Sequence, residues 1–337
     1  MHCYVYKTMT RRYLFLLIMI VVLFAASLVV GSVDIPMRDV MDILTGGKCA
    51  RPAWRFIVLE SRLPQALTAL LSGGALASSG LMLQTAFRNP LAAPDVFGIT
   101  SGASLMVAIV TLGTSMTALP LFLQHVTTVV AAFIGSMVVT LLIWLCSRAV
   151  KSSLLLIIIG IMIGYLASSA ITVLNFFATE EGVKSYAVWG MGNFGNVSLE
   201  QLPFFAVVCV LSTLSTLLLM KPLNALLLGE RYAENMGISF RTTRNLLMLL
   251  TGLQSAVVTA YCGPIAFIAL AVPHIAGMLV RTGNHRQLLP VTILTGSVIA
   301  LLCNLLTTLP GGGGVLPLNA VTPFIGAPVI IYVLLKH

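Results

Sequence analysis

Residues 88–103 read Arg-Asn-Pro-Leu-Ala-Ala-Pro-Asp-Val-Phe-Gly-Ile-Thr-Ser-Gly-Ala and lie between two long apolar segments. Two prolines, two glycines, an arginine and an aspartate interrupt a chain that is otherwise mostly lipid-soluble. Backbone groups at membrane depth must be hydrogen-bonded within the protein, so an irregular stretch is tolerated there only where it is buried or lines a cavity. The stretch therefore indicates a role beyond spanning a bilayer.

The rest of the chain is strongly apolar. Of its 337 residues, 58% are hydrophobic and only 9% are charged, whereas a soluble globular protein has about 25% charged residues. A spanning helix needs about 20 apolar residues, so the chain has room for many spans and none for a soluble domain. The composition therefore predicts an all-α polytopic membrane protein in which residues 1–337 form a single transmembrane domain.

Glycine, proline and charged residues divide the apolar runs into ten predicted spans. Their approximate bounds are 13–31, 63–87, 96–112, 119–146, 153–177, 202–220, 246–262, 265–280, 288–309 and 315–335. The first run is too long for the core of a signal peptide and is interpreted as a retained span. Two connecting loops, 32–62 and 178–200, are each long enough for a short helix, around Met37–Leu44 and Val183–Met191 respectively.

Basic residues are distributed unevenly between the two sides that ten spans define. The side with both termini has 13 basic and three acidic residues, and the other side has six basic and seven acidic residues. In membrane proteins the cytoplasmic loops carry the excess of lysine and arginine. The charges therefore predict that both termini are cytoplasmic, and they account for the net charge of +9 without nucleic acid as a partner.

Spans 2–5 and 7–10 are interpreted as weak copies of each other. In each set the first span is followed by a segment broken by proline and glycine, Arg88–Gly102 in one and Gly263–His274 in the other. The predicted topology places these segments on opposite sides of the membrane, and paired interruptions of this kind indicate an inverted-repeat transporter. The alternative is that proline and glycine are simply frequent in membrane helices.

The largest cytoplasmic loop, residues 221–245, contains two short predicted helices, Asn224–Leu228 and Glu230–Met236. One apolar face is formed by residues four positions apart, Leu228, Tyr232 and Met236. An exposed apolar face with charged neighbours suits the groove of a protein partner. The alternative is a helix that lies on the lipid surface.

The sequence lacks the motifs of catalysis and metal binding. It contains no Walker A sequence, no HExxH sequence and no nucleophile beside a base, so we do not expect an enzyme or a chain that hydrolyses ATP itself. No cysteine or histidine cluster has the spacing of metal ligands, and no metal site is expected. His274 lies beside Pro273 in a membrane segment; a packing hydrogen bond is favoured there over a functional role.

Five motifs occur in order along the chain. They are Arg88-Asn-Pro-Leu-Ala-Ala-Pro-Asp with Gly98 and Ser101-Gly-Ala, Gly229-Glu-Arg-Tyr-Ala-Glu-Asn-Met-Gly, Gly263-Pro-Ile-Ala-Phe-Ile-Ala-Leu-Ala-Val-Pro-His, Asn284-His-Arg with Leu289-Pro, and Gly326-Ala-Pro. Together they closely resemble the permease subunits of type II ABC importers for iron-siderophores, haem and vitamin B12. The resemblance covers nearly the whole chain.

The resemblance implies a permease of the bacterial inner membrane that moves a bulky metal chelate from the periplasm to the cytoplasm. It would act as a homodimer with the substrate path on the two-fold axis. Two cytoplasmic ATPase subunits, which hold the ATP and Mg, would dock on the loop at 223–237, and a periplasmic binding protein would deliver the chelate. The chain itself would bind no cofactor.

The substrate class remains open between two chelates. An iron chelate, either an iron-siderophore or haem, is the first expectation, and vitamin B12 is the alternative. A different functional class, a membrane enzyme or a receptor, is the remaining alternative to a permease. The sequence has neither the group of catalytic residues that an enzyme needs nor a soluble sensing domain.

The same resemblance implies roles for individual residues. The cytoplasmic gate of the path would include Asn89, Leu91, Ser152 and Ser153, and the periplasmic gate helix would include Val183, Tyr186, Trp189 and Met191. Coupling to the ATPase would use Leu228, Glu230, Arg231, Tyr232, Glu234 and Met236.

Docking of the binding protein is assigned to arginines. Arg62 matches the first arginine of an Arg-Leu-Pro-Arg pattern, but the second is Gln65 here, so Arg51 and Arg55 are the alternative docking charges.

The broken stretch that contains Asn89 and Leu91 has a simpler alternative to a gate. It could be a tight cytoplasmic turn that is held by a salt bridge between Arg88 and Asp95.

Overall fold

The computed structural model describes residues 2–47, 51–113, 120–150, 152–308 and 315–336. Helices joined by irregular segments make up this described part of the chain, so the all-α prediction is confirmed. The helices are α1 (His2–Val29), α2 (Met37–Leu44), α3 (Pro52–Phe56), the π-helical segment η1 (Ile57–Arg62), α4 (Leu63–Phe87), α5 (Ile99–Gly113), α6 (Leu121–Ala149), α7 (Ser153–Phe177), α8 (Glu180–Gly190), the 3₁₀ turn η3 (Phe194–Asn196), α9 (Leu202–Leu218), α10 (Met220–Leu228), α11 (Glu230–Asn235), α12 (Phe240–Cys262), α13 (Ile268–Val280), α14 (His285–Thr308) and α15 (Leu318–Lys336).

Seven helical stretches of the described residues are long and apolar enough to cross a membrane. They are α1, the continuous stretch from α3 to α4, α6, α7, α12, α14 and α15. The pair α9 and α10 meets the same test together, with a bend of 50° at the junction, and α5 and α13 are shorter apolar helices. Each of the ten predicted spans coincides with one of these elements, but by length and composition the structure supports seven to eight spans.

The predicted start of the second span, at residue 63, is wrong. Residues 32–62 are predicted to form a loop, whereas the helix already begins at Pro52 and continues through η1 into α4. Pro52 suits the first turn, where a backbone N–H has no helical partner. The charge of Arg62 favours a loop when the sequence is considered alone. In the structure, three backbone carbonyls inside the protein accept hydrogen bonds from Arg62. The short helix α2 is confirmed within the predicted bounds.

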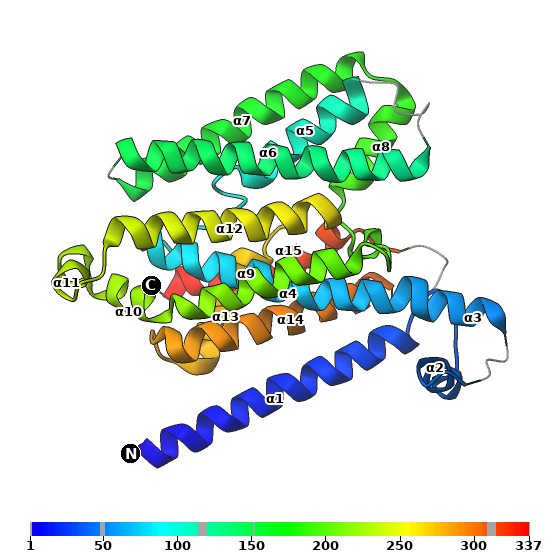
Figure 1. Cartoon of the computed structure of the whole chain (residues 1–337), viewed down its shortest axis with the longest axis horizontal. Helices are drawn as coiled ribbons and strands as arrows, with labels where there is room; N and C mark the ends of the chain where they lie inside the picture. The colour runs from blue at the N-terminus through cyan, green and yellow to red at the C-terminus, as the bar shows by residue number, and fades with distance from the viewer. Residues whose placement is uncertain (1, 48–50, 114–119, 151, 309–314, 337) are drawn as a thin grey trace.

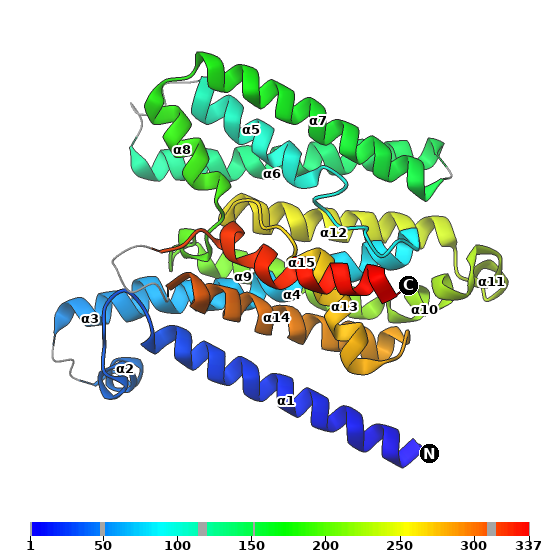
Figure 2. The same cartoon turned by 180° about the vertical axis from the view of Figure 1, so that it is seen from behind.

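Close packing of glycines brings the central helices together. Gly73 of α4 and Gly296 of α14 face each other, and a Cβ at either position would overlap the carbonyl group of the other. Gly102 of α5 and Gly135 of α6 form a similar pair. Small residues of this kind let membrane helices approach closely. In Figures 1 and 2, α5, α6, α7 and α8 form one layer, α4, α9 and α12–α15 form the centre, and α1 lies along the opposite edge.

The two ends of the molecule carry different elements. The beginning of α1, the end of α15 and the pair α10–α11 lie at one end, whereas α2, α3 and α8 lie at the other (Figures 1 and 2). The segment after α4 lies at the first end, since Arg88 bonds to α10. The segment after α12 lies at the second end, since Cys262 bonds to Asn193 just after α8. The two broken segments are therefore at opposite ends, as the sequence predicts.

Candidate functional site

The segment after α4, residues 88–98, turns the chain sharply at the end that carries α10 and α11. Arg88 ends α4 in the left-handed conformation, with φ of 47°. The side-chain oxygen of Asn89 accepts a hydrogen bond from the backbone N–H of Leu91 at 2.8 Å, which closes a tight turn around Pro90. Leu91 is 39% exposed. We call residues 88–98 the gate segment.

Two other helices bind the gate segment directly. Arg88 Nη2 donates to the backbone carbonyl of Leu226 in α10 at 2.9 Å. His274 of α13 places its Nε2 at 2.9 Å from the carbonyl oxygen of Pro90. The predicted hydrogen bond of His274 is therefore present, and its partner is the gate segment.

Asp95 does not form the salt bridge of the alternative turn. Within the described residues its Oδ1 is buried without a hydrogen-bond partner, and Arg88 is directed to Leu226 instead. Burial raises the pKa of Asp95 above its ordinary value, although hydrogen bonds from the backbone N–H groups of Asp95 and Val96 oppose this rise. The segment is thus not a simple charged surface turn.

Helix α7 packs against the far end of the gate segment. Gly98 has φ of 74°, and a Cβ there would come within 2.8 Å of the carbonyl oxygen of Gly160. Ser152 is exposed and caps α7 by accepting from the N–H of Leu155 at 3.5 Å. Ser153 begins α7, but its side chain lies outside the described residues. The structure therefore brings α7 to the gate segment at Gly160, about two turns beyond Ser152.

Helix α7 is also among the least covered helices. Only 17% of its most apolar window is buried, compared with 83% for the stretch Pro52–Phe87. Its uncovered residues include apolar side chains but also a polar set in mid-helix, Tyr165, Ser168, Ser169 and Thr172. Polar residues of a membrane helix face other protein or water in preference to lipid.

Helix α8 contains three of the four residues predicted for the outer gate, and the fourth, Met191, directly follows its last residue. Thr179 caps it by accepting from the N–H of Gly182 at 3.3 Å, so the helix begins before the predicted residue 183. Tyr186 and Trp189 stack with ring centroids 6.4 Å apart. Val183 and Met191 are 37% and 45% exposed.

The loop predicted to couple to an ATPase consists of α10 and α11. Gly229 separates them with φ of 120°, a conformation that glycine adopts without strain. Leu228, Tyr232 and Met236 are 64%, 54% and 59% exposed, so the predicted apolar residues are uncovered, but Leu228 ends α10, Tyr232 is in α11 and Met236 follows α11, so they do not lie on one continuous helix. Glu234 is exposed beside it, and the side chains of Glu230 and Arg231 lie outside the described residues. The two predicted pieces are confirmed as helices, although α10 begins earlier, at Met220.

The predicted docking arginines occupy different environments. Arg62 is only 6% exposed, and its guanidinium donates to the carbonyls of Leu28, Val29 and Val33, which fastens the end of α1. Arg51 and Arg55 are exposed at the end that carries α2 and α8. Of the three, only Arg51 and Arg55 present their charge at the surface.

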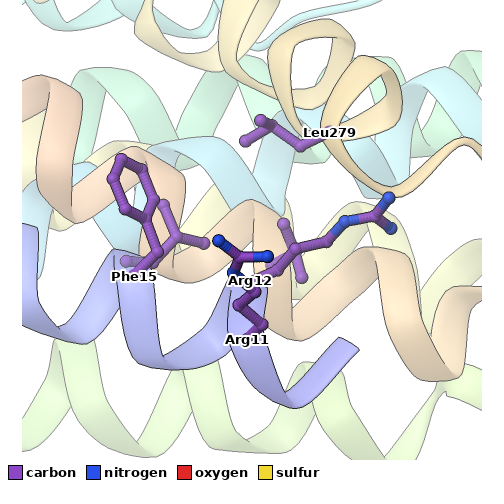
Figure 3. Close-up of a pocket in the computed structure, with 6 residues that line it drawn as sticks. Arg11, Arg12, Phe15 and Leu279 are labelled. Atoms are coloured by element: carbon purple, nitrogen blue, oxygen red, sulfur yellow. The ribbon is translucent and has the colours of Figure 1, made fainter. Parts of the chain in front are cut away.

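Outside the gate segment, metal ligands and a cavity are the features of the described residues that could mark a chemical site. The described residues include no group of three or more histidines, cysteines, aspartates or glutamates that could hold a metal ion. A cavity of about 270 Å³ lies between α1 and the helices α13 and α14. Figure 3 shows Arg11, Arg12, Phe15 and Leu279 around it. Its mostly apolar lining, on the outer edge of the bundle, is not part of the gate segment.

A polar cluster beside the gate segment was not predicted from the sequence; its His285 and Thr85 are buried and its Asn224 is half-buried. Asn224 of α10, His285 of α14 and Thr85 of α4 are joined by hydrogen bonds. The motif Asn284-His-Arg was the only signal for this cluster, because the partners of His285 are distant in the sequence.

The chain is similar to known transport proteins over most of its length. Residues 18–336 match the FecCD transport family. The chain is 35% identical over 287 residues to the vitamin B12 import system permease protein BtuC of Salmonella typhi, with 83% of each chain covered. The corresponding protein of Salmonella newport is equally similar.

A solved structure is similar over almost the whole length. It is described as an inward-facing conformation of an ABC transporter assigned to the metal-chelate type. The TM-score is 0.82 at 30% sequence identity, and the match covers 96% of this chain and 98% of the other. Together with the family match, this similarity shows that the chain is a permease, the membrane component of an importer, and not a catalytic enzyme. The chain belongs to the FecCD transport family.

Proposed function

We propose that this permease imports a cobalamin-type metal chelate from the periplasm to the cytoplasm of a bacterium, through a path formed by two copies of the chain. The observation that supports this substrate is the 35% identity to vitamin B12 permeases over 83% of the chain. An iron chelate, which the sequence analysis placed first, is the second candidate. The similar structure of an ABC transporter assigned to the metal-chelate type fits both candidates, because cobalamin is itself a metal chelate.

The proposed topology has ten spans with both termini in the cytoplasm. It adds α5, α13 and the bent pair α9–α10 to the seven longer helical stretches. The cytoplasmic end is the one with the excess of basic residues, as the positive-inside rule requires. The breaks after α4 and α12 at opposite ends support an inverted repeat of spans 2–5 and 7–10.

The proposed path runs along the exposed face of α7 at the interface of the homodimer. Tyr165, Ser168, Ser169 and Thr172 would face this path, because polar side chains are costly against lipid. The gate segment with Asn89 and Leu91 would close it at the cytoplasmic end, together with Ser152 and Ser153. Helix α8, with Val183, Tyr186, Trp189 and Met191, would close it at the periplasmic end.

The proposed partners bind at the two ends. Two ATPase subunits, which carry ATP and Mg, would each cover one apolar face formed by Leu228, Tyr232 and Met236. A periplasmic binding protein would dock at the opposite end, where Arg51 and Arg55 are exposed. Since Arg62 holds the end of α1, its predicted docking role requires a different side-chain arrangement.

The substrate assignment is tested by uptake into proteoliposomes that contain the permease, its cognate ATPase and its binding protein. Cyanocobalamin, a ferric siderophore and haem are compared at equal concentration. We expect ATP-dependent uptake of cyanocobalamin at least about ten-fold above the others, which corresponds to about 1.4 kcal/mol of discrimination. Preferred uptake of an iron chelate would change the assigned substrate from cobalamin to an iron chelate and leave the permease function in place. Uptake of none of the three compounds would contradict the proposal.

A further inference from the structure

A chain of hydrogen bonds connects the proposed ATPase-docking pair α10–α11 to α14. Asn224 of α10 accepts at its Oδ1 from the backbone N–H of His285 at 2.7 Å. The same oxygen lies 3.1 Å from His285 Nδ1. Asn224 Nδ2 donates to Asn284 Oδ1 at 3.0 Å. The beginning of α14 is thus fastened to the docking helix by one amide side chain.

The same histidine continues the chain of bonds to α4. His285 Nε2 lies 2.9 Å from Thr85 Oγ1. His285 is 1% exposed and Thr85 is 6% exposed, so water does not compete for these bonds. Thr85 is in the last turn of α4, three residues before Arg88 at the start of the gate segment.

The chemistry of the side chains fixes the direction of the bonds. An amide oxygen only accepts, so His285 Nδ1 carries the hydrogen that points to Asn224. In a neutral imidazole Nε2 then accepts, and the Thr85 hydroxyl donates to it. The Thr85 hydroxyl also donates to the Leu81 carbonyl at 2.8 Å, so its one hydrogen is shared between the two acceptors. A displacement of His285 would leave this hydrogen with the backbone of α4 alone.

A second bond runs in parallel. Arg88 Nη2 donates to the carbonyl of Leu226, which is also in α10. The docking helix therefore holds both the last turn of α4 and the first residue of the gate segment. Leu223 and Leu226 of α10 are fully buried, so α10 is firmly seated on the bundle on one face while Leu228 is exposed on the other.

We propose that His285 is a positioning residue for gating: with Asn224 and Thr85 it transmits movement of the docking helix α10 to the gate segment. This inference rests on the proposed function, in which α10–α11 binds the ATPase and residues 88–98 close the path. The competing explanation is that the three residues only stabilise the fold.

Two substitutions break the proposed link at different points. Thr85→Val removes the hydroxyl but keeps the shape of the side chain. His285→Asn keeps a polar group near Asn224 but is too short to reach Thr85. The matched control is Thr292→Val, a fully buried threonine of α14 whose hydroxyl donates to Leu288 within the same helix.

The test measures the gate without requiring the substrate. Leu91 is replaced by cysteine in a chain whose six native cysteines are replaced, and the disulfide between the two copies of the chain is quantified. The permease is assembled with its cognate ATPase in nanodiscs and compared with and without ATP and vanadate. Thermal unfolding of each variant is measured in parallel.

We expect nucleotide to change the cross-link yield in the parent and in Thr292→Val. In Thr85→Val and His285→Asn the nucleotide-dependent shift should fall about five-fold, the factor that corresponds to one buried hydrogen bond. A normal nucleotide response in both variants, or a loss that only follows lowered thermal stability and occurs equally in Thr292→Val, would overturn the role of His285. Absence of any response in the parent would instead contradict the proposed gate itself, and the proposal for His285 with it.

Discussion

The breaks after α4 and after α12 share a sequence signal of proline and glycine, but they are built differently. After α12, the side chain of Asn319 accepts from the N–H of Ala266 at 3.2 Å and donates to the carbonyls of Pro264 and Gly190 at 2.7 and 3.2 Å. After α4, the gate segment exposes Leu91, bonds to α10 and α13 through Arg88 and Pro90, and packs against α7 at Gly98. The outer break is thus held by three bonds from one side chain of α15, whereas the inner break is bonded to α10 and α13, so the inner break is the one that we expect to follow a movement of α10.

The largest expected effect concerns Gly263, the first residue of the pinned break. It has φ of 76°, and a Cβ there would overlap the carbonyl group of Trp189. Gly263→Ala should lower the free energy of unfolding by about 2–5 kcal/mol, because left-handed strain and overpacking add. The matched control is Gly46→Ala, with φ of 80° and nothing within 4 Å of a Cβ, which should cost only about 1–2 kcal/mol of strain. Equal losses in both variants, measured by thermal unfolding in detergent, would show that the close packing is unimportant.

A smaller loss is expected for Asn319→Ala in the same break. The substitution removes the partners of three backbone groups, and we expect the free energy of unfolding to fall by about 2–3 kcal/mol. Asn319→Asp keeps the acceptor for Ala266 but loses both donors, so its loss of stability should persist. If Asn319→Ala unfolds at the same temperature as the parent, the outer break is not pinned by this side chain.

The smallest effect on stability is expected in the gate segment. Asn89→Ala removes one partly exposed hydrogen bond to Leu91 and should cost about 0.5–1 kcal/mol. Uptake should nevertheless change at least about two-fold, because the turn positions Leu91 in the proposed gate. Unchanged uptake with unchanged stability would favour the interpretation of the segment as an ordinary turn.

Much of the helical framework follows from the sequence because hydrophobic runs and their interruptions are local signals. The bounds of α2, the two pieces α10 and α11, and the break at Pro90 are confirmed. The early beginning of the second span at Pro52 was missed, because Arg62 is satisfied by carbonyls about 30 positions away. Local patterns contain no information about such distant partners.

The contacts of the candidate site were even less predictable from local sequence patterns than the bounds of the helices. The two short helices around Gly229 were predictable from the sequence, and Leu228, Tyr232 and Met236 are exposed as expected, although the break at Gly229 places them on more than one helix. The link through His285 was not predictable, because its partners Asn224 and Thr85 are 61 and 200 positions distant in the chain. Only the fold brings the three residues together beside the gate segment.

The central claim is that the inner break moves with nucleotide while the outer break stays in place. It is tested most directly by spin-label distance measurements on the permease with its cognate ATPase in nanodiscs. One sample carries labels on the two copies of Leu91→Cys and another on the two copies of Pro264→Cys, each with and without ATP and vanadate. We predict that the distance distribution of the Leu91 pair shifts with nucleotide and that of the Pro264 pair does not. An unchanged Leu91 distribution, or an equal shift of both pairs, would contradict the account.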